Sequence, residues 1–365
     1  MWSFSVIQDF EKGIAKCGES FSSSDNPYVF SHPALLTAWC DTYRPIRNLT
    51  PIFITGTSTN GNTVTFPMVL WKRNWKTAFI KTLVPVGYSD FDYHDPIFKL
   101  KPNDGELKEF WSELISFLKT NVKSDTISID GVTDEYALEQ DNWEKGEICP
   151  MLNLQDIADE DQLMKFFKTS LRGDLRRQIR RLSEIGEVSL TEYHSFEDIP
   201  ETTFSTFMHQ HALRWPKAYK APKLHENILR YGLKAGCAHF SVLKAGDQEV
   251  AWHLGFEYNG RYYYYMPCGH QDYLKHSPTK VHLFYLVSRA IEKGYAVFDH
   301  LRGDENYKDG WSNGLQYVNT LIANNETAIS TFKHNMLKIR HLITPPDKTL
   351  TSSYLRCTNT YKYAA

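Results

Sequence analysis

The chain has 365 residues, of which 42% are hydrophobic and 23% are charged, and its formal net charge is −2. These fractions are typical of a globular protein long enough for two domains. A net charge so close to zero excludes the polybasic character of a nucleic-acid-binding chain, and no apolar run approaches the about 18 residues that a membrane-spanning helix needs.

The amino terminus and the cysteines bear on location. The opening MWSFSVIQDFEKG lacks the apolar core of a secretory signal. The six cysteines are scattered and form no C-x-x-C pair, which is typical of free thiols rather than of disulfides or a zinc site. They are Cys17, Cys40, Cys149, Cys237, Cys268 and Cys357. We therefore expect a cytoplasmic protein with no metal, no DNA partner and no insertion into a membrane.

The first half of the chain reads as an α/β domain. Ser31 is the candidate N-cap of a helix that has Pro33 in its first turn and extends to Tyr43. Alternating apolar residues around Asn60-Gly61 predict a three-stranded antiparallel meander, followed by a polar loop, a helix and a strand. The expected ranges are 52–56, 63–71 and 77–84 for the meander, 87–96 for the loop, 106–119 for the helix and 126–132 for the strand.

The second half repeats this order, which indicates a tandem pair of α/β domains. Asn259-Gly260 is the dipeptide that a type I′ hairpin needs, and Gly294 is placed to end a helix. The expected ranges are 200–215 for a helix, 238–244, 249–258 and 261–266 for a meander, 269–279 for a loop, 281–293 for a helix and 295–301 for a buried strand. The two copies share no obvious residue identity, so a coincidental α+β order is the alternative.

Two features of the second half suit an anionic ligand. The loop before Val281 delivers backbone N–H groups to a helix N-terminus, with Lys275 and Lys280 beside it. The alternative is an ordinary crossover helix with solvated lysines. Residues 170–186 form an amphipathic helix with leucines on one side and five arginines on the other, which is either an anion-binding surface or a solvated connector. The arginines are Arg172, Arg176, Arg177, Arg180 and Arg181.

Several segments together resemble a known family. They are the arginine-rich helix, HQHALRW with Arg214 and Trp215, the Ser277-Pro278 loop, and AIEKGYAVFDHLRGDENYKDGW. In this order and spacing the chain, over roughly residues 25–315, resembles the CelD/BcsL-type acetyltransferases of the GNAT superfamily, which are related to the FemAB aminoacyltransferases. The first half agrees through Ser31-His32-Pro33 and the acidic, aromatic loop that ends at Pro96.

The resemblance implies a mixed α/β fold with two GNAT-like domains joined by the arginine-rich helix. The implied boundaries are 1–165 for an acceptor-side domain, 166–345 for an acyl-CoA-side domain and 346–365 for a polar tail. Donor contacts fall on one strand and on the following loop and helix start. They are Met266, Cys268, His276, Ser277, Pro278, Thr279, Lys280 and Val281. Family phosphate loops are usually rich in glycine, whereas this one contains none.

The resemblance also implies direct acyl transfer, with a base for the acceptor and a group that stabilises developing charge. Candidate bases are Asp299, His211 and His253, and Lys308 is the candidate for charge stabilisation. Each has a structural alternative, such as a turn carboxylate, a packed histidine or a solvated lysine. The expected substrate contacts are Asp92, Tyr93, Arg176, Arg180, Arg214, Trp215 and Arg302.

We therefore predict an N-acyltransferase that moves acetyl from acetyl-CoA to an amino group of a sugar or surface-polysaccharide precursor. One alternative is a FemAB-like enzyme that uses aminoacyl-tRNA and a peptide acceptor, in which the arginine-rich helix would meet RNA phosphate. The other is a GNAT-like protein that binds without turnover, which the glycine-free phosphate loop supports. The H-E-x-x-H and G-x-S-x-G strings of zinc enzymes and serine hydrolases are absent from the sequence.

Overall fold

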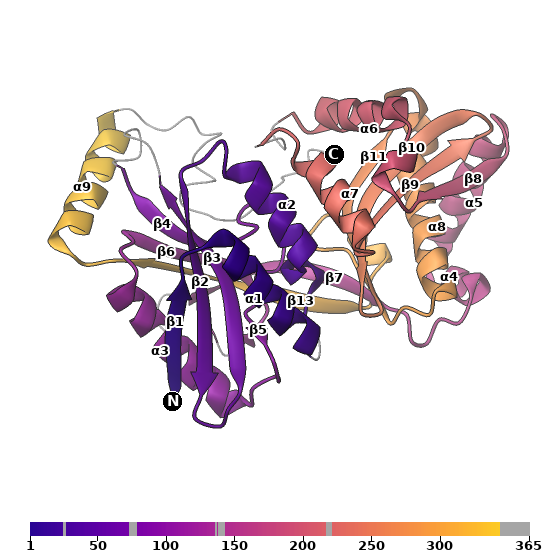
Figure 1. Cartoon of the computed structure of the whole chain (residues 1–365). Coiled ribbons are helices and arrows are strands. Elements are labelled where there is room, and N and C mark those ends of the chain that lie inside the picture. The colour runs from indigo at the N-terminus through magenta and orange to yellow at the C-terminus, as the bar shows by residue number, and fades with distance from the viewer. Residues whose placement is uncertain (25–26, 73–78, 136, 138–142, 217–220, 344–365) are drawn as a thin grey trace. The chain divides into compact units, whose positions relative to one another are not determined.

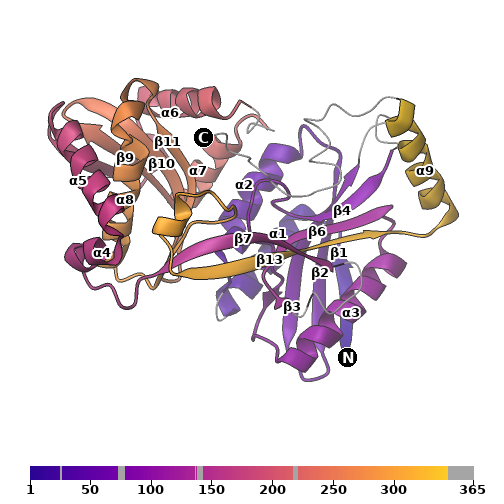
Figure 2. The same ribbon diagram turned by 180° about the vertical axis from the view of Figure 1, so that it is seen from behind.

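The computed structural model describes residues 1–24, 27–72, 79–135, 137, 143–216 and 221–343. Its contacts divide the chain into two compact units, shown from two sides in Figures 1 and 2. The first unit combines Met1–Ile148 with the chain from Tyr317 onward, and the second is Cys149–Gln316. Among the described residues, no helix has the length and apolar character needed to cross a membrane.

The first unit is built on a mixed sheet of seven described strands, with helices packed on it. Its strand order is β1-β2-β3-β4-β6-β13, and β5 pairs with β3. The elements in chain order are β1 (Trp2–Ile7), α1 (Phe10–Ser23), α2 (Pro33–Tyr43), β2 (Leu49–Ser58), β3 (Thr63–Lys72), β4 (Lys81–Pro85), β5 (Ile97–Phe98), α3 (Asp104–Asn121), β6 (Thr126–Val132), β13 (Gly314–Asn324) and α9 (Ala328–Ile343). Phe110, Trp111 and Leu114 of α3 fill the core on one face of this sheet.

The second unit repeats the plan with the strand order β8-β9-β10-β11-β12-β7. Its elements are β7 (Trp143–Asn153), which begins in the first unit, α4 (Glu160–Phe166), α5 (Thr169–Ser183), β8 (Val188–Tyr193), α6 (Glu201–Arg214), α7 (Leu224–Lys234), β9 (Ala238–Ala245), β10 (Gln248–Tyr258), β11 (Arg261–Gly269), α8 (Pro278–Glu292) and β12 (Val297–Asp299). Apolar residues of α8, among them Leu283 and Val287, pack against Phe298 of β12.

The two units therefore share one order: a strand, two helices, a three-stranded meander, a helix, and a strand parallel to the last strand of the meander. The parallel pairs are β4 with β6 and β11 with β12. The predicted tandem α/β architecture is confirmed. The hairpin at Asn259-Gly260 is also confirmed, because both residues have the positive φ of a type I′ turn (48° and 69°).

Some local predictions were wrong. The N-cap of α2 is His32, whose Nδ1 accepts from the Ala34 amide (3.1 Å), while Ser31 ends a short 3-10 turn. The packing also divides the chain differently from the expected boundaries 1–165 and 166–345. Residues 149–165 belong to the second unit, because β7 pairs with β12, and the chain from 317 returns to the first, because β13 pairs with β6. The tail 346–365 lies outside the described residues.

Candidate functional site

Strand β11 extends beyond the end of its parallel neighbour β12. The edge of β11 beyond that point has no described strand paired with it, and we call it the open edge. The β11–β12 pairing joins Arg261 to Val297 and ends where Tyr263 meets Asp299, although β11 continues to Gly269. The register of β10 against β11 shifts just beyond Tyr263, which bends the strand. From Tyr264 onward no described strand pairs with that edge of β11, so its backbone can receive an extended ligand.

The hydrogen-bond alternation decides which groups of β11 face the open edge. The His270 amide donates to the Val250 carbonyl (2.9 Å). In an antiparallel ladder every second residue bonds the partner strand, so Cys268 bonds β10 and Pro267 does not. Proline has no N–H, and the Pro267 carbonyl faces the side where β12 has ended. A ligand amide that lies along this edge would find an acceptor there.

Asp299, a candidate base, is fully buried at the end of β12. Its Oδ2 accepts from Arg261 Nη1 (2.9 Å), and its Oδ1 accepts from the Leu301 amide (2.9 Å). Leu301 has a positive φ of 59°, which a turn of this kind requires. These bonds favour a carboxylate that holds the turn. Arg302, an expected substrate contact, is itself buried in the same turn.

Lys308, the candidate for charge stabilisation, is buried below the same turn. Its ammonium group donates to the carbonyls of Leu301 (3.1 Å), Arg302 (2.7 Å) and Gly303 (3.4 Å), and Glu305 lies 2.8 Å away. Three carbonyls and one carboxylate use the full donor capacity of a lysine. The geometry therefore favours a structural role, in which Lys308 ties the chain after β12 into a closed loop.

His253, a third candidate, belongs to a buried polar network. The Tyr262 hydroxyl lies 3.0 Å from His253 Nδ1 and 2.9 Å from His239 Nδ1, and His239 Nε2 donates to Glu192 (2.8 Å). His253 also stacks on Tyr264 (4.5 Å between rings). Burial holds the pKa of His253 well below its usual value, so the imidazole is neutral. Its Nε2 is buried and has no hydrogen-bond partner among the described residues.

His211 differs from the other candidates because it belongs to a cluster at the far end of β11. It lies on α6, and burial together with His225 and Arg214 lowers its pKa to about 3, so it is a neutral imidazole at pH 7. The positive charge of Arg214 also acts to lower the pKa of Tyr264 and of Cys268 on β11, against the larger effect of burial. Helix α6, which carries both residues, contacts the end of β11, where the Cys268 sulfur lies 3.8 Å from the Phe207 carbonyl. Trp215 lies under the Arg214 guanidinium (5.1 Å).

Cys268 and Tyr264 are both protonated in this cluster. Burial raises the pKa of the Cys268 thiol to about 12 and raises that of the Tyr264 hydroxyl above its usual value. A thiol in that state is a poor nucleophile, whereas a protonated tyrosine can donate a hydrogen bond. Met266, another expected donor contact, is buried between them on β11. These states favour direct transfer over a cysteine-bound intermediate.

The start of α8 is only partly suited to a phosphate. Ser277, with φ 46°, takes the left-handed conformation that glycine adopts most easily. The amides of Lys280 and Val281 already donate to the Ser277 carbonyl (3.0 and 3.3 Å), and Pro278 has no N–H. The Thr279 amide and the side chains of Thr279 and Lys280 are what this turn offers an anion.

The arginine-rich helix α5 packs beside that turn within the second unit. Leu175 and Leu182 are buried, and the arginines Arg176, Arg177, Arg180 and Arg181 lie on the outer side of the helix, as the amphipathic pattern predicts. Asp174 of the same helix binds Lys280 of α8 (2.5 Å) and also pairs with Arg177. The helix therefore carries a basic outer face and a carboxylate next to the expected phosphate position, where His276 is half-buried.

The first unit closes the corresponding strand edge with its own chain. Strands β4 and β6 pair only at Thr82 and Leu83, and the loop 87–95 then returns to β6. The His94 amide donates to the Gly131 carbonyl (2.8 Å), and Asp95 accepts from the Thr133 amide (2.8 Å). A loop bonded to β6 in this way occupies the place that stays open beside β11.

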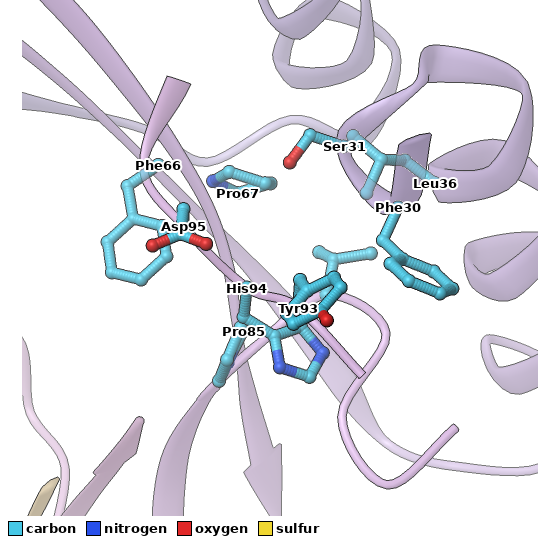
Figure 3. Close-up of a pocket in the computed structure, with 10 residues that line it drawn as sticks. Phe30, Ser31, Leu36, Phe66, Pro67, Pro85, Tyr93, His94 and Asp95 are labelled. Carbon is cyan, nitrogen blue, oxygen red and sulfur yellow. The ribbon is translucent and has the colours of Figure 1, made fainter. Parts of the chain in front are cut away.

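A small pocket remains beside that loop. Figure 3 shows residues that line it, among them Tyr93, His94 and Asp95 of the loop and Phe66 and Pro67 of β3. Tyr93 is buried against Tyr28 (4.5 Å between rings), and the expected substrate residue Asp92 is half-buried beside it. The same loop is anchored through Asp90, which accepts from Trp39 Nε1 (3.0 Å) and the Tyr43 hydroxyl (2.8 Å).

The start of helix α3, which follows this loop in the first unit, is acidic and would repel an anion. Asn103 caps α3 by accepting from the Glu106 amide (3.0 Å), and Glu106 accepts in return from the Asn103 amide (3.1 Å). The first turn of α3 contains Asp104 and Glu106, whereas the first turn of α8 contains no acidic residue. Of the two equivalent helix starts, α8 alone has the electrostatics for a phosphate.

One group of possible metal ligands occurs among the described residues: Glu192, His239 and Glu257, whose ligand atoms lie within 4.8 Å of one another. Cations of the chain already meet these carboxylates. Arg289 Nε lies 3.1 Å from Glu192, and Lys293 Nζ lies 2.9 Å from Glu257. The bond from His239 lowers the pKa of Glu192 to about 2. The group is best described as an ion-pair network at the surface end of the His253 chain.

Comparisons with known proteins agree with this fold. Residues 169–309 match the family described as "Acetyltransferase (GNAT) domain". The chain is similar to the structure titled "Crystal structure of FemX", at 13% identity and a TM-score of 0.58, covering 88% of this chain and 98% of that one. It is also similar to the structure of L-PGS from Bacillus licheniformis, at 11% identity and a TM-score of 0.53, covering 89% and 96%. A comparison with curated proteins found no match.

A third solved structure has the same relationship to the chain. It is the C-terminal domain of a putative lysylphosphatidylglycerol synthetase from Agrobacterium fabrum, at 8% identity and a TM-score of 0.53, covering 92% of this chain and 97% of that one. Similarity at such identities establishes a shared fold. Together with the family match, it makes the second unit a GNAT-type acyltransferase domain, a class that typically takes an acyl-CoA donor. The CelD/BcsL type stays a prediction.

The predicted site residues thus fall into separate groups. Asp299, Arg302 and Lys308 share the turn after β12, His253 lies in the core network, and His211 and Arg214 lie on α6. Sequence reasoning missed Arg261, Tyr264, Pro267 and His225. Tyr264 and Pro267 stood in or next to the predicted strand, but only the register shows that β12 ends before them.

Proposed function

We propose that the second unit transfers an acyl group, acetyl in the first instance, from acetyl-CoA to the amino group of a small acceptor. The observation that carries this proposal is the open edge of β11 beyond Tyr263, with the Pro267 carbonyl facing it. The acceptor class is taken from the resemblance described above: an amino sugar or a related surface-polysaccharide precursor. In this proposal the first unit serves the acceptor side, since its own strand edge is filled by residues 87–95.

The reaction that suits these groups is direct. The acceptor nitrogen attacks the thioester carbonyl, a C–N bond forms, and the C–S bond breaks as the CoA thiolate leaves. We assign to His211 the role of taking the proton that the nitrogen loses, and the lowering of its pKa to about 3 by burial makes it a weak base for this step. The Tyr264 hydroxyl keeps its proton at pH 7, and we assign to it the hydrogen bond that the oxyanion or the departing sulfur would accept. Alignment of donor and acceptor supplies much of the rate.

Thermal unfolding with acetyl-CoA tests the donor. A ligand at 100 times its Kd stabilises the folded state by about 2.7 kcal/mol, which shifts Tm by a few degrees in a chain of this size. We expect this shift for the wild type and for Lys119→Glu, whose lysine is exposed on α3 of the first unit. Lys280→Glu should lose most of the shift, because it places an acid in the first turn of α8. Absence of any wild-type shift would refute acetyl-CoA as the donor.

A second candidate function is supported by one observation. Helix α5 presents Arg176, Arg177, Arg180 and Arg181 on its outer side in the same unit, and Asp174 already neutralises Lys280. A donor attached to RNA would use this basic face instead of a pyrophosphate site, as in FemAB-like aminoacyl-tRNA-dependent transfer. Binding of a tRNA pool that weakens steeply with salt, and fails in the double variant Arg176→Glu with Arg180→Glu, would favour it. Lys119→Glu, at an exposed position of α3, is the matched charge control.

A further inference from the structure

Helix α9 packs on the first unit through its polar side. Ser330 Oγ donates to Asp125 Oδ1 (2.7 Å), and Lys333 Nζ binds Asp125 Oδ2 (2.8 Å). One turn further, His334 Nε2 lies 3.0 Å from Thr126 Oγ1 at the start of β6. Figure 1 shows α9 in yellow near β4 and β6. The residues that hold α9 in place are therefore a serine, a lysine and a histidine.

The apolar side of α9 points to solvent. Ile329 is 69% exposed, Phe332 64%, Met336 48% and Ile339 56%. Their spacing of three, four and three residues places them along one stripe of the helix, opposite the docked residues. An ordinary surface helix buries such a stripe and exposes its polar side. A continuous apolar stripe that is exposed to solvent indicates a binding surface for another protein or for a membrane.

The charge of α9 indicates which of these partners it binds. Its sequence, AISTFKHNMLKIRHLI, contains Lys333, Lys338 and Arg340 and no acidic residue, although the whole chain has a net charge of −2. Lys338 is exposed and Arg340 is half-buried. A helix that combines a bulky apolar stripe with cationic residues and no acidic ones fits the interface of an anionic lipid layer. A pair of α9 helices from two copies would bring together only cations, because the helix has no acidic residue to pair with them.

We propose that α9 binds anionic lipid surfaces, with its apolar stripe among the headgroups and the exposed Lys338 adding attraction to lipid phosphates. The contacts of Ser330, Lys333 and His334 with Asp125 and Thr126 keep the helix fixed to the first unit meanwhile. Binding of this kind places the protein on a membrane surface without crossing it. The inference rests on α9 alone and is independent of the proposed acyl transfer.

Vesicle flotation of the full-length protein tests the proposal. We expect flotation with phosphatidylcholine vesicles that contain phosphatidylglycerol, at least about tenfold weaker binding to pure phosphatidylcholine, and weakening by salt. Phe332→Ser with Met336→Ser should abolish flotation, and Lys338→Glu should reduce it about tenfold. The matched controls are Leu100→Ser, an exposed leucine before α3, and Lys119→Glu, an exposed lysine on α3. Both should float like the wild type.

Three results would overturn the proposal. The first is no flotation of a folded wild type with phosphatidylglycerol vesicles. The second is flotation that the serine double variant leaves unchanged, since binding would then lie elsewhere. The third is a dimer in sedimentation velocity that the double variant dissociates while flotation is absent, which would assign the stripe to a second copy. Circular dichroism of each variant confirms folding, and every substituted side chain is exposed, so none of the changes removes a core contact.

Discussion

The carboxylate of Asp174 on α5 binds the ammonium group of Lys280 on α8 at 2.5 Å. The bond lowers the pKa of Asp174, so the carboxylate stays ionised at neutral pH. Lys280 is the one lysine in the first turn of α8, and its charge is committed to this partner before any ligand arrives. An anionic donor must therefore compete with Asp174.

Replacing Asp174 by asparagine should strengthen donor binding. The Asp174→Asn change keeps the size of the side chain but leaves Lys280 free for the pyrophosphate of acetyl-CoA. We expect Kd to fall roughly three- to tenfold, since a partly exposed charge pair is worth about 1 kcal/mol. Isothermal titration measures it, with Asp161→Asn on α4, an exposed aspartate, as the control. Unchanged or weaker binding would show that acetyl-CoA does not approach this turn.

Lys308→Met should destabilise the protein rather than remove one catalytic step. The change leaves three carbonyls without their donor and the Glu305 carboxylate without its partner, in a buried site. Leaving such groups unpaired costs about 2–4 kcal/mol. Urea unfolding measures the loss, and Lys275→Met, at an exposed position, is the control. A variant with wild-type stability and no activity would instead support the predicted catalytic role.

His211→Gln should slow transfer without weakening the donor. If His211 accepts the proton of the acceptor, kcat should fall about 100-fold or more while KM for acetyl-CoA stays within a factor of about two. His209→Gln, two residues earlier and exposed, should leave both constants unchanged. Equal losses in the two variants would mean that α6, and not the His211 imidazole, is what the reaction needs.

Stability should fall as the pH drops below neutrality. Burial lowers the pKa of His211, His282 and His300 to about 3 and that of His225 to about 4, while an unfolded histidine titrates near 6.5. Below pH 6.5 the unfolded chain therefore binds more protons than the folded one. The stabilisation is complete above that pH and declines toward pH 3, by at most about 2 kcal/mol per histidine at pH 5. A Tm that stays constant from pH 7 to pH 5 would contradict this.

Much of the fold was readable from local patterns. Asn259-Gly260 located the hairpin, and the apolar spacing around Phe110 and Val287 located α3 and α8. The amino-terminal strand β1 escaped prediction because Trp2 and Phe4 pack against α3, over a hundred residues away in the sequence. Edge strands such as β8 also carry a weak pattern, since most of their side chains are only half-buried.

The sequence predicted the candidate site less well than the fold, because the type of a residue does not show which hydrogen-bond or ion-pair partner it will have. Asp299 and Lys308 have the chemistry of catalytic groups, but Arg261 and the carbonyls of the 301–303 turn already engage them. The sequence suggested His253 as a base. His253 lies on β10, which is flanked by β9 and β11, and this position makes it a core residue. The part of the site that depends on where β12 stops could not be foreseen, since strand length is set by pairing between distant segments.

The course of β13 has a consequence for how the protein is made. This strand completes the first sheet by pairing Asn319–Asn324 with Thr126–Val132, yet it leaves the ribosome only after the whole second unit has been synthesised. The second unit, Cys149–Gln316, is contiguous and can fold as it emerges, while the amino-terminal sheet waits with β6 uncovered. The second unit of a newly made chain should therefore fold before the first. Truncation before residue 319 should destabilise the first unit more than the second.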